Sequence, residues 1–406
     1  MNDFISVDKA IELILEIPAN VVETNINISK SMGRVLSQPI MADRNLPPYD
    51  RVMMDGFAIH SESWCSKVSR YRLVGEQAAG SSGAKIHNPD ECIEVSTGAR
   101  LPCGANVVLP IEWSRREGEQ VVFKLPDDEI VRPWLYVHQE ASDYPAGSSL
   151  VSAGTVVGPP EVAISASCGY TDLSVYQVPK VCIVGTGAEL VDLDQVPLPY
   201  QIRKSNIYAL AAVCQTIGAC ELKTESVNDD AQILREIILR EEKHSDILVF
   251  TGGVSVGRHD HLPRVLVECG YEKVFHGVSQ SPGKPMWFGK KTNGSIAFGL
   301  PGNPISALVC FVRFVEPLIL HLQGRPRSIQ PIVEIDQKIE FEPPLTRFLP
   351  VRLKESAQSF PIATPCPPNN SGDLAALGGT DGFVELDAEA KTFNRGFRAE
   401  FFRWHP

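Results

Sequence analysis

The 406-residue sequence lacks three features that would each point to a class of protein: an excess of positive charge, paired cysteine motifs and a long apolar run. It has 38 Lys and Arg against 49 Asp and Glu, a net charge of −11, whereas a duplex nucleic-acid binder needs a basic face. A small anionic ligand stays compatible, because a few local groups can bind it. The best apolar stretch, residues 307–320, is interrupted by Arg313 and Glu316 and is shorter than the roughly 18 residues of a membrane span.

The ten cysteines are scattered, and none has the Cys-x-x-Cys spacing of a zinc knuckle or a dithiol redox site. We expect free, mostly buried thiols in a reducing cytosol. The first residues lack a basic segment followed by an apolar one, so no secretion signal is predicted. These observations favour a cytoplasmic protein with no nucleic-acid or membrane partner.

The first 150 residues divide into two patterns. Residues 1–45 read as helical, with Ser6 capping a first helix and Pro18 ending it. Further on, Pro and Gly punctuate short β-type runs, which predicts an irregular β region. Those runs are residues 71–74, 92–95, 107–109 and 120–123.

Residues 177–326 alternate short apolar runs with amphipathic segments, the pattern of a doubly wound α/β domain on a parallel sheet. Asn206 is the expected cap of one helix, which closes at Gly218, and Asp229 or Asp230 caps the next. Residues 327–406 return to β runs and predict a small C-terminal β domain. The expected strands are 181–184, 220–227, 246–250, 296–300, 332–335, 348–353, 382–386 and 398–403, and the last helix is 305–322.

Residues 251–260 form the strongest candidate ligand loop, because they follow a buried-type strand at the carboxyl end of the predicted sheet. Gly252 and Gly253 would let backbone N–H groups approach phosphate oxygens. Ser255 adds a hydroxyl and Asp260 a carboxylate. The Gly-Gly pair alone is better explained as a tight turn, but the whole run after a strand favours a ligand loop.

Two Pro/Gly motifs are weaker candidates. In the first, Gly283 precedes Lys284, whose ammonium can pair with a phosphate. In the second, Pro301 and Gly302 lead into a helix whose N-terminus, at Asn303 or Ser306, suits an anion. Each motif in isolation is more often a simple turn.

Three acidic segments are ambiguous by themselves. Glu189 follows a predicted strand, where a solvated loop residue is the ordinary explanation. Asp50 and Asp55 lie behind two prolines, but Asp-Gly is also a common turn. His259-Asp260-His261 is a weak metal candidate without a third histidine nearby, so a solvated turn is preferred.

Taken together, the motifs resemble the molybdopterin molybdenumtransferase family, the MoeA and gephyrin E-domain type, over nearly the whole chain. The similarity rests on six blocks in family order. They are Pro-Pro-Tyr-Asp-x-x-x-Met-Asp-Gly-Phe-Ala at 47–58, Thr97-Gly98-Ala99 with 102–105, Gly185-Thr186-Gly187-x-Glu189-Leu190, Thr251-Gly252-Gly253 through Gly257, Pro282-Gly283-Lys284-Pro285, and Gly299-Leu300-Pro301-Gly302-Asn303-Pro304.

This resemblance implies an elongated four-domain protomer that forms a homodimer. Residues 1–45 and 147–176 would form a split N-terminal linker domain of helical and β structure, and 46–146 an inserted β domain. Residues 177–326 would be the molybdopterin-binding α/β domain, and 327–406 a C-terminal β-barrel-like domain. The implied reaction inserts molybdate into adenylylated molybdopterin with Mg²⁺ and releases AMP; an adenylyltransferase is a further implied partner.

The resemblance also implies a set of site residues, each carried over by its motif. The catalytic set is Asp55, Asp143, Glu189, Asp229 and Asp260, of which Glu189, Asp229 and Asp260 would bind the metal. Binding of pterin, phosphate or nucleotide falls to Thr97, Gly252, Gly253, Ser255, Gly283, Lys284, Pro301, Gly302, Asn303 and Ser306.

Several positions depart from the family pattern. Ala188 replaces an Asp, and Ser281 and Gly277 stand where the family has lysines. Because molybdate is a dianion, the loss of two cations should weaken its site. We hypothesise that Arg258, His259 and Lys204, which fall inside the same motifs, partly replace the missing charge.

Three functions fit this pattern. The first is an active molybdenumtransferase, which the glycine loops and acidic residues favour. The second is a degenerate paralogue that binds molybdopterin or a nucleotide as carrier, scaffold or regulator, which the missing lysines and Ala188 favour. The third, a nucleotide-sugar or other phosphate-ester enzyme on a similar α/β domain, is weaker, because it does not explain the early Met-Asp-Gly block.

Overall fold

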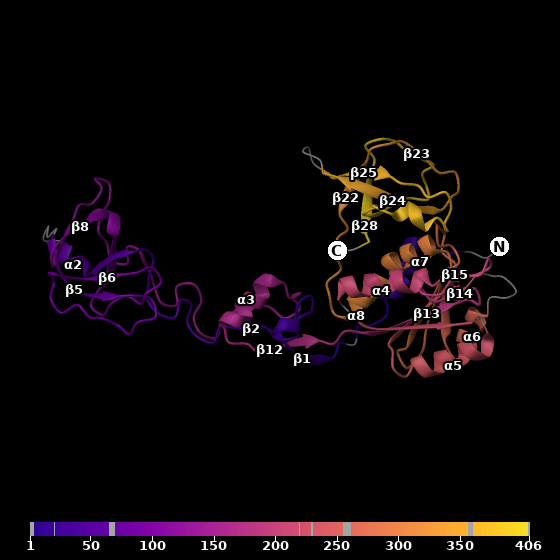
Figure 1. Cartoon of the computed structure of the whole chain (residues 1–406), viewed down its shortest axis with the longest axis horizontal. Coiled ribbons are helices and arrows are strands. Elements are labelled where there is room, and N and C mark those ends of the chain that lie inside the picture. Colours follow the sequence, from indigo (N-terminus) through magenta and orange to yellow (C-terminus); the bar gives the residue numbers. More distant parts are fainter. Residues whose placement is uncertain are drawn as a thin grey trace. The chain divides into compact units, whose positions relative to one another are not determined.

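The computed structural model (Figure 1) describes residues 4–404 except 20, 65–69, 219, 229, 255–260 and 356–359. The chain forms two compact units. The larger unit contains residues 1–38, 154–159 and 172–406, and the smaller unit contains 39–153 and 160–171. The four-domain division stays a prediction.

A six-stranded mixed sheet is the centre of the larger unit. Its order is β16 (Glu221–Val227), β13 (Lys180–Thr186), β17 (Ile247–Thr251), β21 (Ile296–Leu300), β20 (Trp287–Lys290) and β18 (Glu272–His276). The first four strands are parallel, as predicted. Sequence reasoning predicted neither β20 nor β18, and these two strands pair antiparallel, so the sheet is mixed and not wholly parallel. Residues 291–295 join β20 to β21, and so short a connection can only reverse the chain.

Helices cover both faces of this sheet and confirm the doubly wound architecture. Alternate residues of β13 point to opposite sides, with Ile183 in one apolar core and Val184 in the other. The helices of the first core are α1 (Val7–Leu15), α4 (Ser205–Ile217), α7 (Pro304–Cys310) and α8 (Glu316–Leu322) (Figure 1). Those of the second are α5 (Ala231–Glu241) and α6 (Leu262–Glu268).

Most predicted helix ends are confirmed. The Ser6 hydroxyl accepts a hydrogen bond from the Lys9 N–H, Asp230 caps α5, and Gly218 ends α4 in a left-handed conformation. Asn206 is not a cap, because α4 begins at Ser205 and its cap position is Lys204.

The helical interpretation of residues 1–45 is wrong beyond α1. After Pro18 the chain forms β1 (Glu23–Asn27), which pairs antiparallel with β12 (Asp172–Tyr176). Partly buried side chains alternate with exposed ones along β1, which is the period of a strand. Sequence reasoning extended the helical pattern of the preceding residues over this segment and so missed the strand. A short 3₁₀ helix, Ile28–Lys30, follows it.

The last helix of the α/β domain is continuous from Pro304 to Leu322, with a π-helical turn at Phe311–Val315 between α7 and α8. Its 19 residues are long and apolar enough to cross a membrane, but 67% of an 18-residue apolar stretch within it is buried inside the structure. Burial of that extent is typical of a core helix.

The C-terminal region is a closed five-stranded barrel, which confirms the expected small β domain. Arg313 joins it to the α/β domain through an ion pair with Glu385 at 2.6 Å, and Phe348, Phe383 and Phe402 extend the first core into it. The barrel strands, in order, are β24 (Thr346–Lys354), β25 (Ile362–Pro365), β22 (Ile332–Ile335), β28 (Arg398–Arg403) and β26 (Gly382–Leu386). The barrel closes because β26 also pairs with β24. Outside it, β19 (Gln280–Ser281) pairs with β24, and β23 (Ile339–Glu340) pairs with β27 (Thr392–Phe393).

The smaller unit is built on an irregular β sheet, as predicted. Two short pairs lie outside it: β3 (Arg51–Val52) with β10 (Val137–His138), and β2 (Ile40–Met41) with β11 (Ser149–Val151). The sheet order is β7 (Val107–Pro110), β4 (Gly56–Ile59), β6 (Glu91–Val95), β5 (Arg70–Gln77), β9 (Gln120–Phe123) and β8 (Ser114–Glu117); the helices are α2 (Ser61–Trp64) and α3 (Pro159–Ser167).

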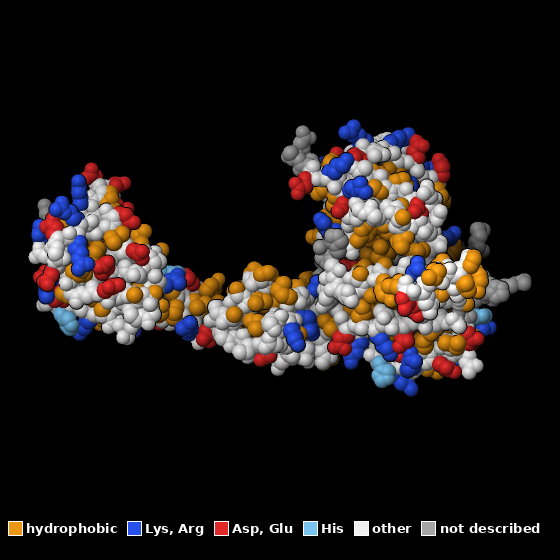
Figure 2. Space-filling view, viewed as in Figure 1, with side chains coloured by type: hydrophobic (Ala, Val, Ile, Leu, Met, Phe, Trp, Pro, Cys, Tyr) orange, Lys and Arg blue, Asp and Glu red, His pale blue; other side chains and the backbone are white. Residues whose placement is uncertain are grey.

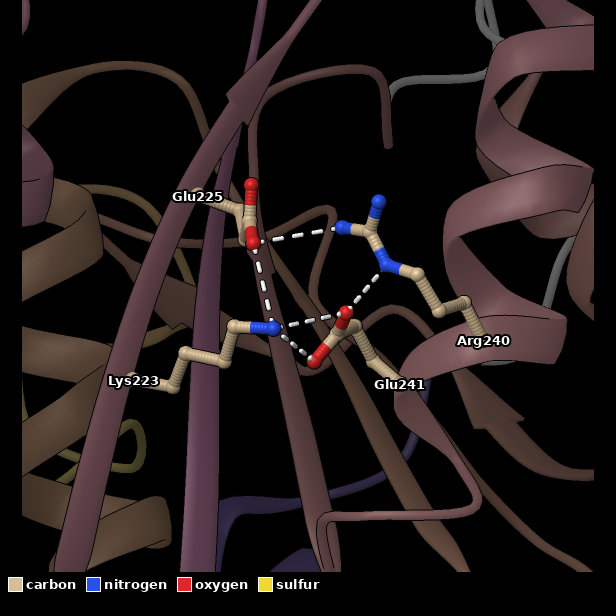
Figure 3. A network of polar contacts seen from close by, with 4 residues as sticks. All are labelled: Lys223, Glu225, Arg240 and Glu241. Atoms are coloured by element: carbon tan, nitrogen blue, oxygen red, sulfur yellow. Dashed lines mark hydrogen bonds and ion pairs between the residues drawn. The ribbon is translucent and has the colours of Figure 1, made fainter.

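An ion network joins the edge strand β16 to α5 (Figure 3). The fully buried Glu241 carboxylate accepts hydrogen bonds from Lys223, at 2.9 and 2.8 Å, and from Arg240 at 2.5 Å. Glu225 lies 3.2 Å from each of these two cations. Burial would raise the pKa of Glu241, but the hydrogen bonds from Lys223 and Arg240 outweigh it, so the pKa is lowered and the carboxylate stays charged.

A second buried carboxyl, that of Glu316 in α8, predicts a pH-dependent stability. Burial raises the pKa of Glu316 from 4.5 to about 7, against the opposing charge of Arg325. A raised folded-state pKa stabilises the fold at low pH, and this stabilisation is lost as pH rises through 7. At pH 8.5 we expect Glu316→Gln to have a higher urea midpoint than the native chain, with an unfolding free energy larger by up to roughly 3 kcal/mol. At pH 4 we expect no such difference. Exposed Glu272→Gln is the control, and equal pH profiles for native and Glu316→Gln chains would contradict the prediction.

Candidate ligand site at the strand ends

Three parallel strands of the larger unit end at one edge, where their loops meet. The Gly252 N–H, after β17, donates to the Leu300 carbonyl at the end of β21, at 3.0 Å. Gly252 has φ +102°, and a Cβ there would lie 2.5 Å from the Thr186 carbonyl at the end of β13. Only glycine fits this approach, which agrees with the tight-turn explanation of the Gly-Gly pair. Because the Gly252 N–H is already bonded to Leu300, a phosphate-binding role of this loop stays a prediction.

The Asn206 side chain connects these loops. Its Nδ2 donates to Thr251 Oγ1 and to the Gly302 carbonyl, each at 2.8 Å. Its Oδ1 is buried and has no hydrogen-bond partner among the described residues. A buried acceptor without a partner, at the edge of the sheet where ligands bind, is expected to accept a hydrogen bond from a ligand or from an ordered water. Sequence reasoning missed this role, because both partners lie far away in the chain.

The start of α7 is arranged differently from the predicted anion site. Asn303 holds the cap position, but its Nδ2 donates to Ser371 Oγ at 2.6 Å. The Ser371 carbonyl also accepts from the Ile305 N–H at 3.3 Å. Ser306 is buried. A residue of the C-terminal region therefore already occupies part of this helix end.

Lys284 lies beside an aromatic ring that the sequence did not reveal. Its ammonium is 4.5 Å from the centroid of the Phe4 ring, an attractive cation–π arrangement. The same ring fills the space at Gly277, where a Cβ would lie 2.1 Å from a Phe4 carbon. The Ile5 N–H donates to the Gly277 carbonyl, and the Ser279 N–H donates to the Ile5 carbonyl. A lysine at position 277 is therefore excluded in this conformation. Gly283, before Lys284, is buried against Cys310 and Gln280.

Glu189 follows β13 at the same edge and has an exposed carboxylate that folds over Gly187. Beyond it, the segment between β14 (Leu190–Val191) and β15 (Ile202–Arg203) carries a patch of hydrophobic side chains on the surface (Figure 2). The exposed residues there are Leu193, Val196, Leu198, Tyr200 and Ile202.

Several predicted site residues, Asp229, Ser255 and Asp260, lie outside the described residues, as do Arg258 and His259. Lys204 is described, and its ammonium lies 2.7 Å from Asp192. Its charge is therefore already paired, and the compensation hypothesis stays a prediction. Within the described part of the chain, no group of three side chains is close enough to hold a metal.

The smaller unit holds the two remaining acidic candidates. Asp55 Oδ1 accepts hydrogen bonds from the Thr97 N–H at 2.7 Å and from Thr97 Oγ1 at 2.8 Å. The backbone bond, followed by the hydroxyl bond, lowers the pKa of Asp55. Asp143 Oδ1 lies 2.8 Å from Nε2 of His138, a residue that sequence reasoning did not select.

Three sequence families match successive parts of the chain. Residues 5–169 match the MoeA N-terminal region (domain I and II), 182–321 a probable molybdopterin binding domain, and 333–404 the MoeA C-terminal region (domain IV). A protein from Synechocystis sp. named molybdopterin molybdenumtransferase is 36% identical over 98% of this chain and 100% of its own length. The chain belongs to the MoeA family. A Nostoc sp. protein of the same name is 33% identical over 76% of this chain and 71% of its own.

The architecture of this MoeA-family chain also matches a solved relative. A molybdopterin biosynthesis MoeA protein from Pyrococcus horikoshii covers both chains completely, with a TM-score of 0.82 and 27% identity. The resemblance drawn from motifs and the expected multidomain fold are therefore confirmed.

Replacing Asn206 tests the connection between the strand-end loops. Asn206→Asp removes the two N–H donors and places a carboxylate against the Gly302 carbonyl. We expect a loss of about 1–3 kcal/mol in unfolding free energy and faster hydrogen exchange at residues 251–252. Ser205→Ala, one residue earlier in α4, is the matched control. Unchanged exchange in Asn206→Asp would show that the amide does not hold the loops.

Replacing Thr97 tests the electrostatics of Asp55. Thr97→Val keeps the N–H donor and removes the hydroxyl, so the pKa of Asp55, measured by NMR titration, should rise partway toward its ordinary value. Thr97→Ser retains a hydroxyl and should leave this pKa nearly unchanged. A low pKa in both variants would assign the whole effect to the backbone bond.

Proposed function

We propose that this MoeA-family chain inserts molybdate into adenylylated molybdopterin in a Mg²⁺-dependent reaction that releases AMP and molybdenum cofactor. The observation that carries the proposal is the end-to-end similarity to the Synechocystis protein named molybdopterin molybdenumtransferase. The strand-end edge supports it, because its loops follow the carboxyl ends of parallel strands, where ligands of α/β proteins bind.

The proposed metal site uses oxygen donors only. Mg²⁺ prefers carboxylate and amide oxygens, and Glu189, with Asp229 and Asp260, supplies that chemistry. The exposed Glu189 carboxylate has no ion-pair partner in the described part of the chain, which fits a role in binding a cation. When bound, Mg²⁺ would neutralise phosphate charge as the phosphoanhydride is cleaved.

The chain's own residues would bind and orient the substrate. Gly302 offers an exposed backbone, Gly252 lets the strand ends pack closely, and Lys284 offers a cation whose position the Phe4 ring restrains. Gly253, Ser255 and Asn303 would also contact the pterin and phosphate groups. Gly283, Pro301 and Ser306 are buried and would contribute by shaping these loops. In the smaller unit, Asp55 and Asp143 are proposed as catalytic residues and Thr97 as a binding residue.

A second candidate is a family paralogue that binds molybdopterin or a nucleotide without turnover. The observation that favours it is the Phe4 ring at Gly277, which removes space for a second cation near Lys284. We propose the transferase first for two reasons. The strand-end loops pack closely at the edge of the sheet, and a protein that only carries molybdopterin would not need the acidic candidate residues.

The proposed setting follows from this chemistry. The partners would be molybdopterin, molybdate, a second copy of the chain and a molybdopterin adenylyltransferase. Neither nucleic acid nor a membrane is a proposed partner, and the proposed location is the cytoplasm.

The transferase proposal is tested by incubating the full chain with adenylylated molybdopterin, Mg²⁺ and molybdate. We expect AMP and molybdenum cofactor in equal amounts, both abolished by EDTA. Lys284→Met should lower kcat/KM at least about tenfold, because an anion loses its charged partner. Lys290→Met, at the end of β20, is the matched control.

Each other result of this assay decides between the candidates. Substrate binding without AMP release would support the carrier and contradict the transferase. If the chain bound neither molybdopterin nor nucleotide, both proposals would fail.

A further inference from the structure

Both ring nitrogens of His138 are engaged in the smaller unit. The pairing of β3 with β10 places Arg51 opposite His138. Arg51 Nη2 lies 2.9 Å from His138 Nδ1, and His138 Nε2 lies 2.8 Å from Asp143 Oδ1. Three charged or titratable side chains therefore form one line, which ends at a carboxylate.

The chemistry of arginine decides where the ring proton lies. A guanidinium group has N–H donors and no acceptor, so His138 Nδ1 must accept the hydrogen bond from Arg51. An accepting Nδ1 carries no proton, and the ring is then neutral with its proton on Nε2. That N–H donates to Asp143, so all the hydrogen bonds run in one direction, from Arg51 through His138 to Asp143.

The backbone around Asp143 is fastened as well. The N–H groups of Asp143 and Tyr144 both donate to the Leu46 carbonyl, each at 3.0 Å, and the Ala141 N–H donates to the Pro47 carbonyl at 3.1 Å. The Glu140 N–H donates to Asp50 Oδ1 at 2.9 Å. These bonds fix the Cα of Asp143, so its remaining freedom is side-chain rotation, which the bond from His138 restrains.

The carboxylate of Asp143 is held on one side and open on the other. Its side chain is 49% exposed, whereas that of His138 is 25% exposed. The hydrogen bond described for this carboxylate involves Oδ1, and Oδ2 has none among the described residues. A carboxylate fixed by one oxygen is pre-organised to act with the other.

We propose that His138 is a positioning residue, which in its neutral Nε2–H form holds Asp143 Oδ1 so that Oδ2 is presented to the substrate. This inference rests on the proposed function, in which Asp143 is a catalytic residue. Arg51 sets the tautomer and so acts one step further from the substrate.

The tautomer is tested without any reaction. In ¹⁵N NMR spectra of the full-length chain at pH 7.5, His138 should give the signals of a neutral ring protonated at Nε2. In Arg51→Met the ring should exchange between both neutral tautomers or take up a proton. A charged ring, or a proton on Nδ1 in the native chain, would overturn the inference whether or not the chain is a transferase.

The positioning role is tested with amide substitutes. A glutamine N–H₂ can reach the place of Nε2, whereas an asparagine N–H₂ reaches only the place of Nδ1. In the AMP-release assay we expect His138→Asn and His138→Ala to lower kcat about tenfold with little change in KM, and His138→Gln to recover most of it. Exposed His87→Gln is the control.

The outcomes separate this inference from the proposed function. Equal losses in all three His138 variants would indicate a merely structural histidine and contradict the positioning role. A native chain that releases no AMP would contradict the proposed function, and the NMR result would then decide the arrangement of His138 alone.

Discussion

One side-chain amide, that of Asn206, ties together the edge on which the larger unit's site depends. Its two N–H bonds reach Thr251 on one strand end and Gly302 on the next. Backbone groups can bind a ligand only if their loops hold still, and loops are otherwise the most mobile part of an α/β fold. Gly252 completes the arrangement, because any side chain there would push the β13 and β17 ends apart.

The smaller unit prepares its carboxylates by the same means. Asp55 is restrained through one oxygen by Thr97, and Asp143 through one oxygen by His138. In both, the described hydrogen bonds reach Oδ1, and the residue is exposed. The candidate residues of the larger unit differ in kind: Glu189, a proposed metal ligand, has an exposed carboxylate, and Lys284 is a cation beside the Phe4 ring.

Sequence reasoning predicted the parts that local patterns control. Apolar runs gave β21 and β22 with their observed bounds, and capping chemistry identified Ser6 and Asp230. It failed where distant partners decide. The role of Asn206 depends on residues 45 and 96 positions away, and the contact of Phe4 with Gly277 joins the two ends of a long chain segment. His138 gave no local signal, because its importance comes from strand pairing with Arg51.

The ion network of Figure 3 has a consequence for how the larger unit meets other chains. β16 is the outer strand of its sheet, so one row of its backbone N–H and C=O groups has no neighbouring strand in that sheet. Lys223 and Glu225 stand along that border and are bound to α5. A strand from another molecule could pair there only by stripping water from these charges. The network thus disfavours intermolecular β-pairing at this edge of the sheet, and neutral side chains at the same positions would not have this effect.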